Sequence, residues 1–390
     1  MKKIIFSILF SISMLFAQSE ASGLVDSVYW VDMHNGNDSN NGTSAATAFK
    51  TIHKVLATNT YLSSEVVTTT IKVMPSVVAG SPNGYYDFGD SELYLATSND
   101  FELIGVAGPD STIFDAESKN RHMSLYYGQS NKSIIQGITF RNGKSTNWPD
   151  GGSIYISMST NIQFIDCVWK NNSSSYGSDG GGAIHIRDKA TPSFTSCVFD
   201  SNFVDVDDNS TSGGAISIQY PQNETDLKSA IKIKRSKFSN NYVKAKYQAT
   251  GGAIHSRRAI EIENSLFVNN GAISNNGGSN NSSFGGAIAL NINWYDNGYK
   301  IADAYIKNST FHGNYIKSLS SSTGDMVGAA IAHAQWDNAG QKTFIFNTII
   351  TGSRALVVND TTDYDTSNLS SDYKKRLIVG EANSGNNKLT

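Results

Sequence analysis

The chain is poor in proline, cysteine and net charge. It holds six prolines and two cysteines among 390 residues, and its formal net charge is −3. Two cysteines cannot build a disulfide framework or a four-cysteine zinc site. No basic stripe is present, so we expect no nucleic-acid partner. The sequence also has no nucleophile elbow and no phosphate-binding glycine loop, which removes two common catalytic motifs.

Apolar runs long enough to cross a membrane as a helix are absent after the first residues. The start differs: Lys2 and Lys3 precede an apolar run from Ile4 to Phe16, and small residues follow at Ala17 and Ala21. A basic start, a short apolar stretch and a small-residue cleavage site are typical of a secretory signal peptide. We therefore expect residues 1–21 to be removed and the protein to be exported.

Glycine is plentiful, and it marks a repeat. A Gly-Gly-small-Ile unit recurs along the middle of the chain at intervals that differ from copy to copy. Its copies begin at Gly151, Gly181, Gly213, Gly251 and Gly285, with a weakened copy at Gly328. Repeats of this length indicate stacked units, each of which buries its apolar face only against its neighbours.

A second unit trails the glycine pairs and has the pattern small-x-aromatic-x-x-Asn. Five copies end at Asn172, Asn202, Asn241, Asn270 and Asn314. Asparagine tolerates the left-handed backbone of a tight corner, and stacked amides can bond from one coil to the next. The pattern predicts an asparagine ladder inside a turn.

Short segments within each repeat alternate apolar and polar residues. In Ile184-His185-Ile186 and Ile216-Ser217-Ile218 the isoleucines would face inward and the polar residues outward. A propeller would show a longer, more even period, and a helical solenoid would show helical periodicity. The pattern predicts an all-β fold, a right-handed parallel β-helix, with insertions gathered mostly at one corner between the Asn and the next Gly-Gly.

Four short motifs lie between Val28 and Leu56: Tyr29-Trp30-Val31-Asp32, Asn35-Gly36-Asn37-Asp38, Asn41-Gly42-Thr43-Ser44 and Ala48-Phe49-Lys50-Thr51-Ile52. This run resembles the opening of many secreted β-helix proteins of the pectin-lyase-like superfamily, including some polysaccharide lyases. The resemblance implies a capped solenoid and export.

A short helix is expected within this opening. Thr43 or Ser44 would cap it, and it would plug the first coil. Its apolar face would be formed by Phe49, Ile52, Val55 and Leu56. The expected organisation is a signal peptide at 1–21, a cap at 22–60, a β-helix at 61–358 and a polar tail or incomplete coil at 359–390.

The paired repeats from Gly151 to Asn314 also resemble those of polymorphic outer-membrane proteins, a family of bacterial surface adhesins. The resemblance implies a secreted protein or one on the outer surface of a bacterium. It also implies contact with a polysaccharide or a cell-surface glycan. After Asp360 the chain turns polar, and we expect it to be a fragment of a longer protein.

Two His-x-Arg pairs follow the glycine repeats. His185 with Arg187 and His255 with Arg257 would project from one face, two coils or about 10 Å apart at strand spacing. Imidazole and guanidinium groups there could bind an acidic sugar or supply acid–base chemistry. The alternative is that these long polar side chains cover a solvated sheet face.

Two acidic groups bear on metal binding. Glu261 and Glu263 would share an outward face, as ion ligands or as part of an ordinary solvent-facing strand. The run from Asp32 to Asn41 could bind Ca²⁺ through oxygen ligands, although its spacing departs from an EF-hand and a turn-rich cap explains it equally. We predict no metal centre and no cofactor, with Ca²⁺ the one ion left open.

Aromatic residues in the insertions are the strongest functional lead. Trp148, Trp294, Tyr295 and Trp336 lie beside Asp and Asn residues. A flat apolar ring with polar groups at its rim suits sugar recognition, and the same rings could instead fold over a coil edge.

Cys167 and Cys197 occupy identical positions in adjacent repeats. Export would permit a disulfide, but two side chains pointing the same way from neighbouring strands give poor torsions. We expect packed free thiols.

Three functions remain in view. The leading hypothesis is a non-catalytic, adhesin-like β-helix that contacts glycans or partner surfaces. The second is a polysaccharide lyase, or a related carbohydrate-active enzyme, that acts on an acidic glycan. The third is a structural spacer for a further module. The fold alone cannot choose among them.

Overall fold

The computed structural model describes residues 27–57, 68–89, 91–95, 99–176, 179–220, 226–227, 229–275, 282–290, 300–301, 303–319, 326–334, 343–357 and 379–382. The predicted signal peptide, at residues 1–21, lies outside these ranges. No helix among the described residues is long and apolar enough to cross a membrane.

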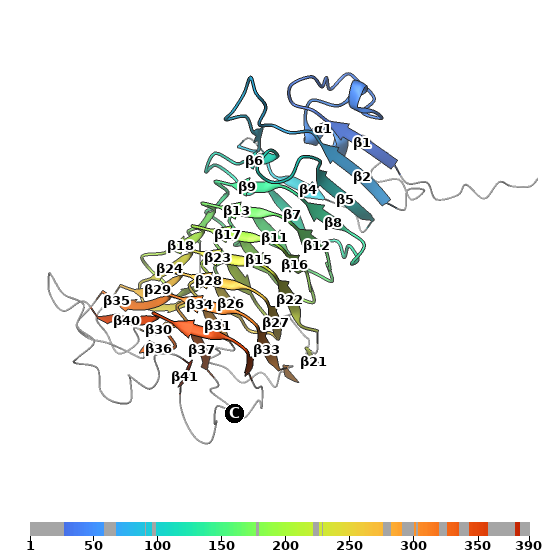
Figure 1. Cartoon of the computed structure of the whole chain (residues 1–390). Coiled ribbons are helices and arrows are strands. Elements are labelled where there is room, and N and C mark those ends of the chain that lie inside the picture. Colours follow the sequence, from blue (N-terminus) through green and yellow to red (C-terminus); the bar gives the residue numbers. More distant parts are fainter. Residues whose placement is uncertain are drawn as a thin grey trace, which may run out of the picture.

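The chain winds into an elongated column of stacked coils, with β1 at one end and β40 and β41 near the other (Figure 1). The strands form four long sheets, numbered 1 to 4 and defined in the next two paragraphs. Each coil passes in turn through sheet 3, sheet 1, sheet 2 and sheet 4, and strands of successive coils pair in parallel. The predicted parallel β-helix is therefore confirmed.

Sheet 1 carries the first strand of the solenoid. Its strands are, in spatial order, β1 (Ser27–Val31), β2 (Thr68–Val73), β5 (Asp100–Gly105), β8 (Ile134–Gln136), β12 (Gln163–Ile165), β16 (Ser193–Thr195), β22 (Ile231–Lys234), β27 (Ile260–Glu263), β33 (Ala304–Lys307) and β38 (Thr343–Phe346). Sheet 2 holds β3 (Tyr86–Asp87), β6 (Ile113–Asp115), β9 (Thr139–Arg141), β13 (Val168–Lys170), β17 (Val198–Asp200), β23 (Lys237–Ser239), β28 (Leu266–Val268), β34 (Thr310–His312) and β39 (Ile349–Thr351).

Sheet 3 follows the glycine pairs. It holds β4 (Leu93–Leu95), β7 (Met123–Leu125), β11 (Ile154–Ile156), β15 (Ile184–Ile186), β20 (Ile216–Ile218), β26 (Ile254–Ser256), β31 (Ile288–Leu290), β37 (Ile331–Ala334) and β41 (Val379–Ala382). Sheet 4 holds β10 (Lys144–Ser145), β14 (Ser173–Ser174), β18 (Phe203–Asp205), β24 (Tyr242–Ala245), β29 (Gly271–Ser274), β35 (Tyr315–Ser318) and β40 (Arg354–Val357).

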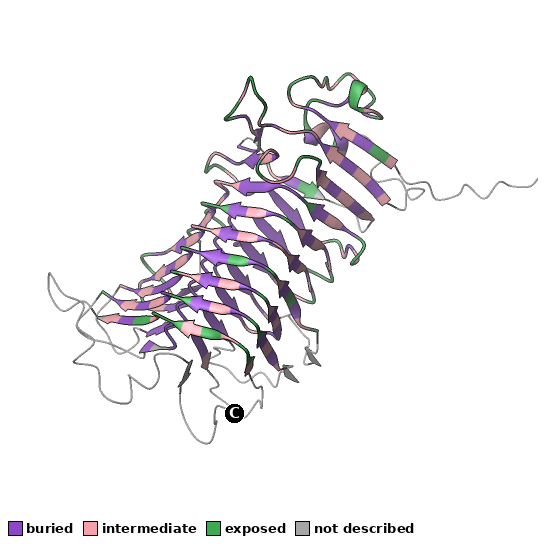
Figure 2. Ribbon diagram, viewed as in Figure 1, coloured by how far each residue is buried: buried purple, intermediate pink, exposed green. Residues whose placement is uncertain are grey.

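The inward faces of the coils form one continuous apolar core, which Figure 2 shows as buried stripes along the column. Within it the aromatic residue of each repeat stacks on the next. Ring centroids are 4.6 Å apart between Trp169 and Phe199 and between Phe199 and Phe238, and the column continues through Phe267 to Phe311. A ring in one coil is therefore buried only because the next coil covers it.

The asparagine ladder forms as predicted. All five side chains are fully buried. The Nδ2 of Asn202 donates to Oδ1 of Asn241 at 3.0 Å, and Nδ2 of Asn241 donates to Oδ1 of Asn270 at 2.9 Å. Each amide also donates to a backbone carbonyl of the preceding coil, such as that of Phe199 for Asn241. The ladder satisfies polar groups that the turn would otherwise bury without partners.

Each glycine pair lies at the corner that precedes a strand of sheet 3, and the geometry of that corner explains why both residues are glycine. Gly181 has a φ of +89°, which glycine adopts without strain. A Cβ on the next residue, Gly182, would lie 2.2 Å from the carbonyl oxygen of Gly214. The first glycine therefore makes the bend, and the second allows neighbouring coils to approach.

Insertions gather at two corners rather than mostly at one. Between sheets 4 and 3, as predicted, a small extra sheet is built from β19 (Thr211–Ser212), β25 (Gln248–Thr250), β30 (Ser282–Phe284) and β36 (Met326–Val327). It packs beside sheet 4 over a second apolar cluster that includes Val243 and Ile316. Between sheets 3 and 1 the pair β21 (Asp226–Leu227) and β32 (Lys300–Ile301) marks further insertions.

The predicted cap is present in a different form. Two short helices replace one: a 3-10 turn η1 (Ala45–Thr47) and a helix α1 (Ile52–Ala57). Ser44 caps η1, not α1, because its Oγ accepts from the backbone N–H of Thr47 at 3.2 Å. The carboxylate of Asp38 accepts from the N–H groups just before α1 instead, at 2.8 and 2.9 Å. That bonding explains the Asp/Asn-rich run as turn structure.

The two thiols are free and buried, as expected. Cys167 and Cys197 begin a ladder of small residues that continues as Ser236 and Ser265, since the backbone N–H of Cys197 donates to the Ser236 hydroxyl. Packing therefore accounts for both cysteines.

Candidate functional site

A cavity of about 450 Å³ lies on the outer face of sheet 3, over β4, β7, β11 and β15. We call it the groove. Cavities of this size are typical of small-molecule sites. The groove belongs to the early coils, where the glycine repeat is only beginning.

Two outward rows of side chains form the floor of the groove. Strand register places Tyr94, Ser124 and Tyr155 side by side on successive coils. Two residues further along the strands, Ser157 and Arg187 lie on the same face, because side chains alternate across a strand. The period-two pattern thus delivers a fixed array of polar and aromatic groups.

Aromatic rings surround this floor. The ring centroids of Tyr94 and Tyr126 are 5.0 Å apart, and those of Trp148 and Tyr155 are 6.3 Å apart. Trp148 is 58% exposed, and Met158 on the opposite flank is also exposed. The groove therefore offers several apolar faces to a ligand.

Two carboxylates lie among these rings. Glu92 accepts a hydrogen bond from Ser124, and Asp188 accepts one from Ser157. Each keeps further lone pairs for a ligand, because an ionised carboxylate accepts several hydrogen bonds. Hydroxyl groups of a ligand are their natural donors.

Arg121 anchors the segment that carries Trp148. Its Nε donates to the Gly151 carbonyl at 3.2 Å, and its guanidinium also donates to the carbonyl of Pro149. A longer ion pair of 3.7 Å joins it to Glu92. Burial lowers the pKa of this arginine, and the nearby charge of Glu92 opposes that effect. The segment from Trp148 to Gly151, which we call the arm, is thus held on the groove.

A second buried ionisable group, the carboxyl group of Asp150, holds the arm in place. The Oδ1 of Asp150 accepts from the Ser174 hydroxyl at 2.7 Å. Burial raises the pKa of Asp150 to about 7, with a further contribution from the charge of Asp179. Asp150, itself part of the arm, thus joins the arm to β14 and does not line the groove.

Arg187 closes one end of the groove. Its guanidinium carbon lies 5.9 Å from the centroid of the Trp148 ring, a cation–π contact. Among the described residues, no carboxylate forms an ion pair with it. Its N–H groups are therefore available to a ligand.

The turn that carries Asp188 is held from two coils away. Arg258 is buried, and its Nη1 donates to the carbonyls of Asp188 and Ala190 at 3.0 and 2.7 Å. Asp188 itself has a φ of +52°, a conformation that few non-glycine residues adopt. Arg258 therefore stabilises an unfavourable turn at the rim of the groove.

The histidines and the arginines of the two predicted His-x-Arg pairs lie in different environments. His185 and His255 do share a face, two coils apart, through β20. Both rings are only 1% exposed, so the expectation of a solvated face is wrong here. The Asp179–Gly180 segment packs against His185, whose Nδ1 bonds to the Gly180 carbonyl at 3.1 Å. Burial lowers the pKa of both imidazoles, which keeps them neutral.

Arg187 lines the groove, whereas Arg257 does not. The guanidinium of Arg257 lies 6.0 Å from the ring of Tyr220. Glu261 and Glu263 are on β27 of sheet 1, a different sheet, and Glu263 pairs with Lys234 at 3.2 Å. These predicted candidates are therefore not brought together, and the ordinary-strand interpretation accounts for the two glutamates.

Trp148 is the one predicted glycan-binding residue that the structure describes. Trp294, Tyr295 and Trp336 lie outside the described residues, so their role stays a prediction. In chain order they follow β31 and β37 of sheet 3, whereas Trp148 precedes β11. The four aromatics therefore do not occupy equivalent places in the repeat.

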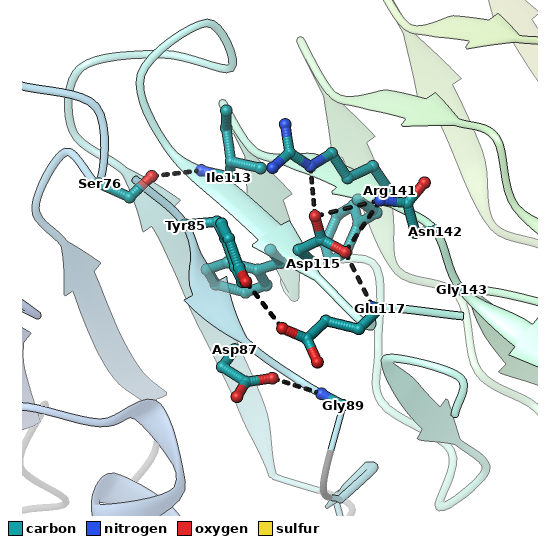
Figure 3. A network of polar contacts seen from close by, with 12 residues as sticks. Ser76, Tyr85, Asp87, Gly89, Ile113, Asp115, Glu117, Arg141, Asn142 and Gly143 are labelled. Atoms are coloured by element: carbon teal, nitrogen blue, oxygen red, sulfur yellow. Dashed lines mark hydrogen bonds and ion pairs between the residues drawn. The ribbon is translucent and has the colours of Figure 1, made fainter. Parts of the chain in front are cut away.

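A second polar cluster, near the first coils, is satisfied internally (Figure 3). Asp115 accepts from Arg141 at 2.6 Å and from Asn142, while Tyr85 donates to Glu117 at 2.7 Å. Its acidic side chains already have partners, which marks it as corner structure. Among the described residues, no group of three or more His, Cys, Asp or Glu side chains could hold a metal ion.

Sequence reasoning missed most of the groove, since only Trp148 and Arg187 of its lining residues are predicted site residues. Glu92, Tyr94, Arg121 and Tyr126 belong to coils that lack the Gly-Gly unit. The one available signal was the alternation in Leu93-Tyr94-Leu95 and Met123-Ser124-Leu125, which would align Tyr94 with Ser124 and Tyr155.

Comparison with models of known protein families gives no match for this chain. Comparison with curated proteins gives none either. The class is therefore defined by the structure itself: a parallel β-helix protein with an aromatic, charged groove on the outer face of one sheet.

Proposed function

We propose that the protein binds a glycan in the groove and acts as a non-catalytic, adhesin-like β-helix, secreted or held at the outer surface of a bacterium. The observation that carries the proposal is the meeting of four aromatic rings and two carboxylates in one cavity of about 450 Å³.

Sugar chemistry fits this combination. The C–H face of a pyranose is apolar and packs on flat rings such as Tyr126 and Trp148, while its hydroxyl rim needs hydrogen-bond partners. Glu92 and Asp188 supply acceptors, and Arg187 supplies donors. Aromatic side chains also lose little conformational entropy on binding.

Binding is favoured over catalysis by the state of the groove's titratable groups. Burial raises the pKa of the Tyr155 phenol, so it stays protonated at neutral pH and cannot accept a proton there. His185 and His255, the other predicted acid–base candidates, are covered by protein. Recognition needs none of these groups to exchange a proton.

The proposal predicts loss of glycan affinity in Tyr126→Ala and Trp148→Ala. Each variant removes one of the aromatic rings that line the groove, and we expect affinity to fall by roughly 30-fold or more, as at an interface hot spot. A glycan array probed with the purified chain identifies the ligand, and titration calorimetry measures the affinity.

Tyr247→Ala is the matched control, because Tyr247 is exposed and does not line the groove. It should bind like the unmodified protein. Equal affinity in all three variants would place glycan binding elsewhere and refute the assignment of the groove.

A second function, lyase activity on an acidic glycan, is favoured by one observation: Arg121 and Arg187 share the groove with Tyr155 and the carboxylates. In such a reaction a base removes the proton beside the uronate carboxylate. The C–O bond at the neighbouring carbon breaks, a C=C bond forms, and the leaving oxygen takes up a proton.

The lyase reaction has a direct assay. Pectate, alginate and glycosaminoglycans are mixed with the protein, with and without Ca²⁺, and unsaturated uronate ends are followed by absorbance. We expect no signal. A signal that Arg187→Gln abolishes would overturn the non-catalytic assignment in favour of the lyase.

A further inference from the structure

The outer row of sheet 3 becomes inaccessible along the column. Tyr94, on β4, is 46% exposed, whereas Ser124 and Tyr155, on the next two coils, are 4% and 7% exposed. From β15 onward the row is closed, with His185 at 1% exposed and Ser217 fully buried. The outer row is therefore open at Tyr94, nearly covered at Ser124 and Tyr155, and closed from His185 onward.

A fixed segment causes this closure. The Asp179 carbonyl accepts from the side chains of Ser212, Ser217 and Gln219, the first and last at 2.9 and 3.2 Å. A Cβ at Gly180 would lie 1.7 Å from the Ser212 carbonyl oxygen, so the segment is packed directly on its neighbours. Three donors and this close approach fix Asp179 and Gly180 over the sheet.

The contact between Trp148 and Arg187 forms a wall in front of that segment. Trp148 precedes β11 and Arg187 follows β15, so their contact crosses the outer face of sheet 3 from one flank to the other. Arg121 holds the arm at one side through the Pro149 carbonyl. Arg258 holds the turn at the other side through the Asp188 carbonyl.

Residues before and after the strands also line the groove. Trp148 and Pro149 line one flank, and Met158 and Asp188 line the other. A chain running along the strands would meet one of these flanks, and a chain running along the column would meet the wall.

We propose that the groove binds the end of a glycan chain, not its interior. This inference rests on the proposed function and adds a specificity to it. A terminal sugar would stack within the ring set and abut the Trp148–Arg187 wall, and the rest of the chain would leave past Tyr94. An internal segment would have to pass through the wall.

Stoichiometry tests the inference. The probes are size-fractionated oligosaccharides and polymers of galacturonate, xylose, glucose and N-acetylglucosamine, titrated by calorimetry with the unmodified protein. For a series that binds, end recognition predicts one protein per chain at every length. Recognition of interior segments predicts a number of bound proteins that rises in proportion to chain length.

The outcomes separate the two proposals. A length-proportional stoichiometry would overturn end recognition and leave glycan binding in place. Absence of binding to every series would overturn both. Tyr126→Ala must lose the signal for the series that binds, since a retained signal would assign the measured ends to another surface and so contradict the inference. Tyr247→Ala is again the control and should retain the binding signal.

Discussion

Replacing Asn241 by alanine is expected to lower the free energy of unfolding by about 3–5 kcal/mol. The Oδ1 of Asn241 accepts from the backbone N–H and Nδ2 of Asn202, both at 3.0 Å, and its Nδ2 donates to the Phe199 carbonyl and to Asn270. Alanine removes all four bonds at a buried site, and the groups left behind have no access to water. Urea unfolding at neutral pH measures the loss.

Asn131→Ala is the control for this substitution, because Asn131 is an exposed turn residue. It should change stability by no more than about 0.5 kcal/mol. A loss below about 1 kcal/mol in Asn241→Ala would mean that water or a rearranged neighbour satisfies the ladder, and that the ladder is not what stabilises the corner.

Acidification is expected to destabilise the protein through its buried histidines. Burial lowers the pKa of both His122 and His185 from about 6.5 to about 4. Between these values the unfolded chain binds protons that the folded chain does not, so stability falls as the pH drops from about 6.5 to 4 and is unaffected above that window. Each shift corresponds to about 3 kcal/mol.

Asp150 acts in the opposite direction. Because its pKa is raised in the folded protein, the folded chain holds a proton that the unfolded chain has released, and stability rises as the pH falls from about 7 to 4. The two effects partly cancel in the unmodified protein. The histidine contribution is therefore measured as a difference between variants.

His122→Gln isolates that contribution. The ring bonds to the Phe114 carbonyl and the Ser153 hydroxyl, so the variant will be less stable at neutral pH. Its stability should nevertheless decline less on acidification, by about 3 kcal/mol between pH 7 and 4. His312→Gln, at an exposed position on β34, controls for the substitution. Parallel pH profiles for His122→Gln and the unmodified protein would rule out the histidine as the source.

The repeats predict the scaffold well because each coil imposes the same structural requirement at the same position of the repeat. Gly181 and Gly213 meet the same crowded corner in successive coils, and Asn202 and Asn241 meet the same buried turn. Each position selects the same residue type for the same physical reason, so the period is visible without a structure.

The groove is harder to predict because the contacts that form it are each made only once and do not repeat from coil to coil. Tyr94 and Tyr126 come from coils without the glycine unit, and Trp148 reaches the groove only through an arm held by Arg121. The burial of His185 depends on the Asp179–Gly180 segment, whose position is fixed by side chains of a later coil. Contacts of this kind leave no period in the sequence.

The self-stacking ladders have a consequence for how such a protein can change. Because Phe199 stacks on Phe238 much as Phe238 stacks on Phe267, each coil presents to its successor nearly the surface that it received from its predecessor. Recombination between two repeats could delete or duplicate a whole turn while leaving rings and amides matched across the junction. The length of the column can then evolve independently of the groove, which is confined to the early coils.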